Sequence, residues 1–595
     1  MSQRFCRSIA ALALALTSAS AAKAIELPAE NDVWLELHID GFQIYSNASP
    51  RVTVEVAQNL ESMRRAVSQA TSMNVRTPLT TKIFVFRNSA TFTPFREAMF
   101  DHSKRMSGAF IAHRDGNYIA INTERDSRGI VFHELMHYFN NNTNPNLPLW
   151  LDEGLAEVYS TFRVAGDMVS VGRPKRNHVR TLRQRMPMPF RQLIAIDRSS
   201  NEYSEGTKQN AFYAQSWALV HYLLFGNVER KAQLPRFMAL IDEGHDTEHA
   251  IFQAFGVSLR VLEAEVRNYV RQGRFLTLSY RVSELRIRQI GEPSEMSYEQ
   301  TLYHLGDLLA HTPPRNHHDA ERFLRAALER DPQHRGVYAT LGYLRAFQDR
   351  KDEAARFYDL AIQDPGADFL PFLLAAENIL RGLSDQPPVN RPAAAQRARD
   401  LFRESIERNP DIPRAWAGLG STYLSDGDPA EGIPHLEKSL EMAPARTRFA
   451  HNLVLLHVRN GDEERARFVI EDFIERLGDQ QVLDELEEAI LQQRVQRVNE
   501  LLRSGRSDVA RPLMVELLEK TEDSQLQSRL RREIAAIEQF AAHGKALAMY
   551  NRAVMLVNEQ KLGEAMKVLD ELIDAGGDED LIATAVGLRT RITGN

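Results

Sequence analysis

Val131-Phe132-His133-Glu134-Leu135-Met136-His137 is the stretch that decides how the first half of this chain folds. On a helix, residues four apart are separated by about 40° around the axis, so the imidazoles of His133 and His137 reach one point in space. Two such imidazoles can bind a metal ion. Glu134 lies about 100° from His133 on the same helix, which suits a general base that acts on a water molecule without being a ligand. The apolar neighbours predict that this helix is buried.

A second segment, Trp150-Leu151-Asp152-Glu153-Gly154-Leu155-Ala156-Glu157, contains a candidate third ligand. The chain between His137 and Glu153 is long enough to finish the first helix, turn through a loop and return along a second helix. We therefore expect Glu153 to complete a metal site of two imidazoles and one carboxylate. The alternative is that both histidines are ordinary surface or core residues, because the His-Glu-x-x-His pattern alone is only a moderately specific signal.

These two segments resemble the gluzincin clan of zinc peptidases, and most closely the bacterial peptidase-MA-like domains that often precede tetratricopeptide repeats. The resemblance implies an α+β metallopeptidase domain in which His133, His137 and Glu153 bind Zn²⁺ and Glu134 is the catalytic base. It further implies that Glu157, one helical turn after Glu153, orients a ligand histidine through its other ring nitrogen. The alternative for Glu157 is an exposed helix carboxylate.

The resemblance also implies a hydrogen-bond donor for the oxyanion that forms during amide hydrolysis. Tyr213, in Phe212-Tyr213-Ala214-Gln215-Ser216-Trp217, matches the tyrosine that such enzymes place near the metal. A core tyrosine gives the same pattern, and Tyr203 and His178 are alternative donors. His221, on the same predicted helix, is expected to be a packing residue.

A β-hairpin is predicted just upstream of the metal-binding helix. Two short apolar runs, Gly108-Ala109-Phe110-Ile111-Ala112-His113 and Tyr118-Ile119-Ala120-Ile121, flank an Asp-Gly turn. In gluzincins this edge strand binds the substrate backbone, so the resemblance assigns Gly108, Ala109, Phe110 and Ile111 to the substrate strand. Aminopeptidase members carry a Gly-x-Met-Glu-Asn-type sequence there. The departure from it in this chain favours an endopeptidase or a hydrolase of unusual amides.

The N-terminus has the pattern of an export signal. Arg4 and Arg7 precede an apolar run, and Ala22-Lys23-Ala24 provides a small-x-small cleavage site, so residues 1–24 are predicted to be a signal peptide. An uncleaved anchor is the alternative. We expect a periplasmic or secreted protein with no membrane span after signal cleavage. The only cysteine, Cys6, lies inside this signal, so the mature chain is expected to have no disulfide.

The length of the chain indicates more than one domain, and its charge argues against nucleic acid as a partner. A chain of 595 residues is too long for one hydrophobic core. With 73 Lys and Arg against 80 Asp and Glu, the net charge is −7, so no basic field favours nucleic acid. We expect an α+β peptidase domain at 25–290, in which the basic stretch 173–191 is a solvated loop. An all-α solenoid is expected at 291–595.

The solenoid prediction depends on repeats. Trp416, Leu419, Gly420 and Tyr423 follow the Trp-x2-Leu-Gly-x2-Tyr pattern of the 34-residue tetratricopeptide repeat. In such repeats small residues let paired helices approach, and large residues fill the space between them. A protein partner or substrate is expected in the groove of the superhelix, and a purely structural solenoid is the alternative.

These observations lead to one functional hypothesis. The chain is predicted to be an exported zinc-dependent peptidase whose tetratricopeptide module recruits a protein partner or a peptide or protein substrate. One alternative is a tetratricopeptide scaffold with a latent or structural metal site. Another is a metallohydrolase of cell-wall peptide amides.

Overall fold

The computed structural model divides the chain into two compact units, 1–427 and 428–595. The structure describes residues 24–594 except 72, 100–106, 125–126, 145–146, 185–187, 199, 201–202, 204–205, 283–289, 313–316, 365, 444–445, 475–479 and 577. The predicted signal peptide, Cys6 included, lies outside the described residues apart from Ala24. Among the described residues, no helix combines the length and the apolar character needed to cross a membrane.

The first unit contains a six-stranded mixed sheet with the strand order β4-β5-β3-β2-β1-β9. Its strands are β1 (Leu35–Ile39), β2 (Phe42–Ser46), β3 (Thr81–Phe86), β4 (Gly108–His113), β5 (Gly116–Asn122) and β9 (Ser294–Glu295). Strands β2, β3 and β5 are parallel, whereas β1, β4 and β9 pair antiparallel with their neighbours. The predicted hairpin is confirmed as β4–β5, and β4 forms one edge of the sheet.

Both faces of this sheet are buried, and the sequence of β3 shows why. Ile83 and Val85 belong to a core on one side of the sheet, while Phe84 and Phe86 belong to a core on the other. Such an uninterrupted apolar run is typical of a strand that is covered on both faces. Helices α2 (Pro50–Ala70) and α4 (Ser127–Thr143) cover the first face.

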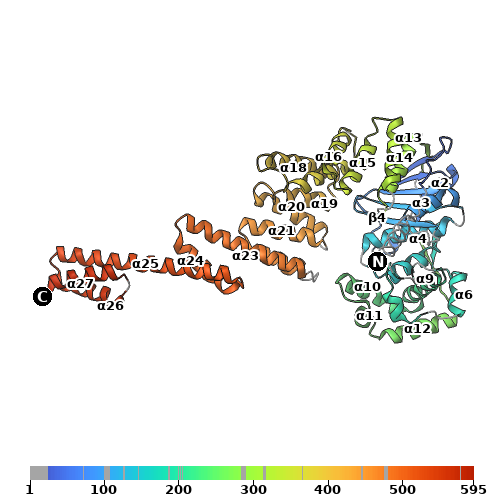
Figure 1. Cartoon of the computed structure of the whole chain (residues 1–595). Helices are drawn as coiled ribbons and strands as arrows, with labels where there is room; N and C mark the ends of the chain where they lie inside the picture. Colours follow the sequence, from blue (N-terminus) through green and yellow to red (C-terminus); the bar gives the residue numbers. More distant parts are fainter. Residues whose placement is uncertain are drawn as a thin grey trace, which may run out of the picture. The chain divides into compact units, whose positions relative to one another are not determined.

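The second face is covered by α3 (Ser89–Met99), α13 (Tyr298–Ala310) and α14 (His317–Arg330) (Figure 1). Leu302 and Leu305 of α13 and Phe323 of α14 share one core with Phe84 and Phe86. These helices come after the expected boundary at 290/291, and so does β9, which pairs with β1. The division at 290/291 therefore does not separate the compact units, because the solenoid begins as part of the core that covers the sheet.

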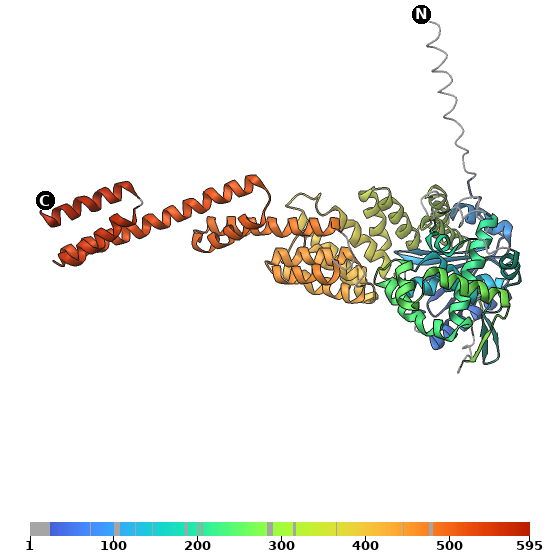
Figure 2. The same ribbon diagram turned by 90° about the horizontal axis from the view of Figure 1, so that it is seen from below.

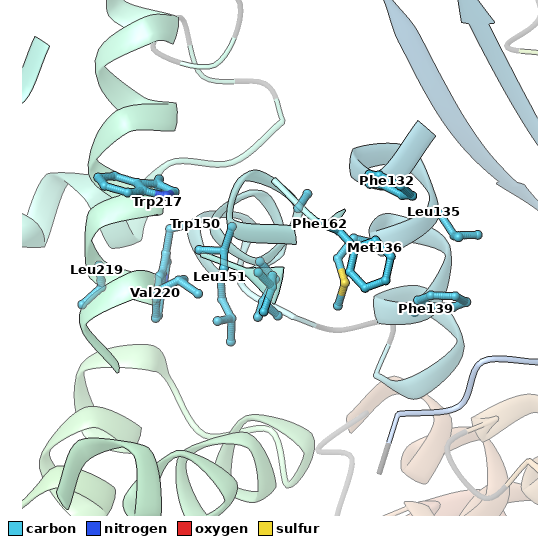
Figure 3. Close-up of a cluster of buried hydrophobic side chains, with 14 of the residues drawn as sticks. Phe132, Leu135, Met136, Phe139, Trp150, Leu151, Phe162, Trp217, Leu219 and Val220 are labelled. Atoms are coloured by element: carbon cyan, nitrogen blue, oxygen red, sulfur yellow. The ribbon is translucent and has the colours of Figure 1, made fainter. Parts of the chain in front are cut away.

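A helical lobe follows α4. It consists of α5 (Leu149–Tyr159), α6 (Arg176–Gln184), α7 (Phe190–Ala195), α9 (Gly206–His221), α10 (Val228–Asp242), α11 (Thr247–Phe255) and α12 (Leu259–Gln272), with a small sheet of β6 (Arg163–Ala165), β7 (Met168–Val171) and β8 (Leu278–Arg281). The basic stretch 173–191 is not a simple loop, because α6 lies within it. Figure 3 shows Trp150 and Leu151 of α5 between Phe139 of α4 and Trp217 of α9.

Helical hairpins complete the first unit. Helices α13 and α14 form the first hairpin, and α15 (Arg335–Phe347) and α16 (Lys351–Ala361) form the second. They are followed by α17 (Phe369–Gly382), α18 (Arg391–Arg408) and α19 (Pro413–Thr422). A Cβ at Gly342 would lie 2.6 Å from the ring of Tyr358, and one at Gly418 would lie 2.3 Å from the ring of Phe402. Small residues therefore face large ones between paired helices, as predicted for the repeats.

The second unit is entirely helical among its described residues. Its helices, orange to red in Figure 2, are α20 (Pro429–Met442), α21 (Thr447–Asn460), α22 (Glu463–Val469), α23 (Gln480–Arg503), α24 (Ser507–Lys520), α25 (Ser524–Asn558), α26 (Leu562–Ala575) and α27 (Glu579–Thr593). Helix α25 has buried residues near its two ends, Leu530 and Ala553, which belong to two separate small cores. Successive helices pack on one another, as in a solenoid.

Candidate metal centre

Helix α4 presents the two predicted histidine ligands at one point. The Nε2 atoms of His133 and His137 are 3.1 Å apart, as expected for residues one helical turn apart whose rings turn to the same side. The opposite side of α4 carries Phe132, Leu135 and Phe139, which are buried in the core of the unit. This packing fixes the helix, and with it the direction of both imidazoles.

Glu153, the predicted third ligand, lies on α5. Its Oε2 atom lies 3.5 Å from Nε2 of His133 and 3.5 Å from Nε2 of His137. The residue after it, Gly154, lets α5 approach α9: a Cβ there would lie 2.4 Å from Cγ2 of Val220 and 2.6 Å from the backbone oxygen of Ser216. The glycine thus sets the depth at which the neighbouring carboxylate enters the site.

The three ligand atoms have the spacing that a zinc ion requires. Ligands about 2.0–2.1 Å from a tetrahedral centre are about 3.3 Å from one another, close to the separations seen here. Glu153 is 2% exposed, and its Oε2 atom has no hydrogen-bond partner among the described residues. A buried carboxylate oxygen without a partner is costly unless a cation or a proton donor occupies the space beside it. The residues present therefore fit Zn²⁺.

Asp152 orients His137. Its Oδ1 atom lies 2.9 Å from Nδ1 of His137 and accepts a hydrogen bond of 2.7 Å from Nδ2 of Asn140. A carboxylate on the outer ring nitrogen keeps the proton there and leaves Nε2 free to bind a metal. The sequence alone did not predict this role for Asp152, although Asp152 is next to the predicted ligand Glu153. The position of Asp152 directly before Glu153 is the sequence signal that could have indicated this role.

Glu157 lies beside the other histidine. Its Oε1 atom is 3.6 Å from Nδ1 of His133, slightly beyond hydrogen-bonding distance, while Oε2 is 2.7 Å from Nε2 of His178 and contacts Nζ of Lys175. Burial opposes the charge of Glu157, yet Lys175 and His178 hold the pKa of this carboxyl far below its usual range. Glu157 is 8% exposed, so it is not the exposed helix carboxylate of the alternative.

The predicted base, Glu134, lies between the metal ligands and the edge strand β4. A Cβ on Gly108 would lie 2.9 Å from Oε1 of Glu134, so only a glycine lets the strand approach this closely. Glu134 is 7% exposed. Burial raises the pKa of Glu134, and the nearby charges of His133 and His137 lower it, with a net rise. The start of β4 and the Glu134 carboxylate therefore lie next to each other on one side of the site.

Two tyrosines lie over the third ligand. The hydroxyl of Tyr203 donates to Oε1 of Glu153 at 3.0 Å, and that of Tyr213 at 3.5 Å. Burial and the charge of Glu153 raise the pKa of Tyr213 well above its usual range, so its hydroxyl keeps its proton. His178 contacts Glu157 instead. His221 packs in the core, with Nε2 at 2.7 Å from the Gly172 carbonyl oxygen.

A family model described as a protein of unknown function (DUF1570) matches residues 129–240, which include α4, α5 and α9. A tetratricopeptide-repeat model matches residues 395–447. The comparison with curated proteins found no match.

Among solved structures, the chain is similar to YrrB, described as a tetratricopeptide-repeat protein with an unusual peptide-binding site, at 15% identity over 31% of this chain and 90% of that chain, with a TM-score of 0.27. It is also similar to MamA, at 17% identity over 27% and 90%, with a TM-score of 0.24. A thermophilic tetratricopeptide-repeat protein of Thermus thermophilus is matched at 15% identity over 32% and 99%, with a TM-score of 0.27. The repeat model shows that the C-terminal part of the chain carries tetratricopeptide repeats.

Proposed function

We propose that this protein is a zinc-dependent hydrolase of peptide bonds, of the gluzincin type. One observation carries the proposal: three ligand atoms of His133, His137 and Glu153 lie within 3.5 Å of one another, and a fourth group, Glu134, stands beside them without being a ligand. A purely structural metal site has no use for that extra carboxylate, whereas hydrolysis requires a base.

Each residue has a role in this proposal. His133, His137 and Glu153 would hold a zinc ion, which would supply Lewis-acid chemistry for the scissile carbonyl and for a water molecule. Glu134 accepts the proton of the attacking water and returns it to the leaving amine. Asp152 holds His137 in place through the outer ring nitrogen, and Glu157 would do the same for His133 after closing the present 3.6 Å to that ring. Tyr213 or Tyr203 donates a hydrogen bond to the oxyanion.

The substrate backbone is proposed to add to the edge strand β4. Its outer edge begins at Gly108, beside the carboxylate of Glu134, so a peptide paired with the strand is carried past the base. Phe110-Ile111-Ala112 stands where aminopeptidases of this type carry Met-Glu-Asn, whose glutamate binds a free amino group. An endopeptidase, or a hydrolase of other peptide-like amides, therefore fits the strand better than an aminopeptidase.

Tetratricopeptide repeats suggest a protein-interaction module. We propose that the repeats bind a protein partner or hold a protein substrate, and that the signal-like sequence 1–24 directs the enzyme to the periplasm or the exterior. A substrate bound by the repeats is presented to the metal at a high effective concentration. The enzyme would therefore cleave protein targets faster than short peptides.

The test compares zinc content and hydrolysis in matched variants. Glu134→Gln should retain about one catalytic zinc and lose nearly all hydrolysis, because an amide does not accept the proton. His133→Ala should lose that zinc as well. Glu248→Gln, which alters an exposed glutamate paired with Arg191, is the control and should behave like the wild type. Wild-type turnover by Glu134→Gln would refute the assigned base.

The substrate class and the oxyanion donor need two further measurements. Profiling of peptides cleaved by the purified protein should separate protein substrates from the cross-linked peptides of a cell wall. Comparison of Tyr213→Phe with Tyr203→Phe should show a loss of kcat on the order of 10²-fold in the variant that lacks the donor, with zinc retained in both. Zinc binding without hydrolysis of any peptide or cell-wall amide would favour the scaffold with a latent or structural site.

A further inference from the structure

A second group of potential metal ligands lies at the other end of the edge strand, away from the centre described above. His113 ends β4, Asp115 lies in the β4–β5 turn, and His311 follows the last residue of α13. One ligand atom from each residue lies within 4.8 Å of the others. All three belong to the first compact unit, so the cluster connects the substrate-strand hairpin to the first solenoid helix.

Two polar atoms in this cluster are buried without a hydrogen-bond partner among the described residues. They are Oδ2 of Asp115 and Nε2 of His311. Asp115 is 4% exposed and His311 is 6% exposed. Burying a carboxylate oxygen or an imidazole nitrogen without a partner is costly, and so few native groups are left in that state. Both atoms belong to the same three-residue group, so one bound cation satisfies both.

The contacts around the cluster leave one atom free on His311 and one on Asp115. Nδ1 of His311 lies 2.9 Å from the backbone oxygen of Asp307, so this nitrogen carries the proton and Nε2 presents a lone pair. Oδ1 of Asp115 accepts a hydrogen bond of 2.6 Å from Arg414, which leaves Oδ2. Nδ1 of His113 is 3.6 Å from that Oδ2 and accepts a hydrogen bond of 3.2 Å from the backbone N–H of Asp115. Nε2 of His113 lies 3.3 Å from the hydroxyl of Tyr343, so the Tyr343 hydroxyl would turn away when this nitrogen binds a cation.

The aromatic residues and charges around the cluster fix it in place. The His311 ring stacks on Tyr343 at 4.5 Å and on Tyr118 at 5.2 Å, so its orientation is set by packing. The Arg414 guanidinium also pairs with Glu377 at 2.7 Å, and Arg114 contacts the same glutamate. The positive charges next to Asp115 are therefore offset by a second carboxylate and do not exclude a cation.

We propose that His113, Asp115 and His311 form a second, structural site for a zinc-type divalent cation. Two imidazoles and one carboxylate are ligands that zinc accepts, and its fourth position can hold water. The ligand atoms, which lie within 4.8 Å of one another, would close by up to about 1.5 Å to reach the tetrahedral spacing of about 3.3 Å. His311 and Tyr343 also help to line a cavity of about 190 Å³.

In this site the ion clamps the β4–β5 hairpin to α13. The proposed substrate strand would then be fixed at both ends, by the close approach of Gly108 to α4 and by the metal at His113. The clamp does not depend on hydrolysis, so it can be tested whether or not the chain is a peptidase.

The experiment uses the full mature chain and zinc as the only added metal. After saturation with zinc and removal of excess ion, elemental analysis should find about two zinc ions per wild-type chain and about one in His133→Ala/His137→Ala. Adding His311→Phe to that double variant should remove the remaining ion. Phenylalanine retains the stacking with Tyr343 and Tyr118, so the fold is expected to persist, as circular dichroism would check.

A matched control and a second readout keep the test decisive. His245→Phe removes a partly exposed histidine elsewhere and should leave both ions bound. Zinc should raise the Tm of the double variant, because a ligand that binds only the folded state stabilises it, and His311→Phe should abolish that rise. If the double variant binds no zinc, or binds zinc that His311→Phe does not remove, the cluster is a hydrogen-bonded histidine and aspartate group and the proposal is wrong.

Discussion

Replacement of Gly154 by alanine tests how the fold positions the metal centre. The added Cβ would lie 2.4 Å from Cγ2 of Val220 and 2.6 Å from the backbone oxygen of Ser216, where ordinary contacts begin at 3.4 Å. Side-chain rotation can relieve the first contact, but the second involves backbone, so α5 and α9 must separate by about 0.8 Å. Glu153 is the preceding residue of α5 and moves with the helix.

The magnitude follows from two opposing effects. Overpacking a core costs about 1–3 kcal/mol, whereas alanine gains about 1 kcal/mol over glycine inside a helix. The free energy of unfolding should therefore fall by about 0–2 kcal/mol. Metal sites tolerate distance errors of about 0.2 Å, so a shift several times larger should weaken zinc binding at least about tenfold.

Denaturant unfolding and competition with a zinc chelator measure these two quantities. The matched control is Gly382→Ala in α17, where a Cβ meets nothing within 4 Å. This control should bind zinc like the wild type and be unchanged or up to about 1 kcal/mol more stable. If Gly154→Ala behaves like Gly382→Ala in both assays, the close approach of α5 to α9 does not position Glu153.

Three further outcomes are expected. A fragment of residues 25–297 should aggregate or bind a hydrophobic dye, because it lacks the helices that cover Phe84 and Phe86, whereas 25–427 should unfold cooperatively in a calorimeter. Asp307→Asn should lower the unfolding free energy by about 3–5 kcal/mol, because it leaves the buried ammonium of Lys82 without its partner at 2.7 Å, and Lys82→Met/Asp307→Leu should recover most of the loss in urea melts. Burial lowers the pKa of His221 from 6.5 to about 4, so the unfolded chain binds more protons in this range. Stability from this residue is therefore lost as the pH falls from 6.5 towards 4, by up to about 3 kcal/mol, and His221→Gln should show a correspondingly smaller loss between pH 7 and pH 4 in urea titrations.

The local sequence was enough to predict the elements that carry the candidate metal centre. The spacing of His133 and His137 has meaning only on a helix, and α4 forms there because its apolar residues pack on α2 and the sheet. The hairpin and the buried strand β3 were also readable, since turn residues and runs of apolar residues are local signals. The small and large residues of the repeats predicted their pairing in the same way.

Only the tertiary structure could show which distant residues meet. Asp152 orients His137, and Tyr203 contacts Glu153, because α5 and the segment before α9 are brought together by long-range packing. Likewise, only the tertiary structure shows which helices cover the second face of the sheet. Phe84 and Phe86 signal a buried face, but their sequence does not say that the first solenoid helices bury it. Periodicity reports which side of an element is apolar, whereas its partner depends on the packing of the whole chain.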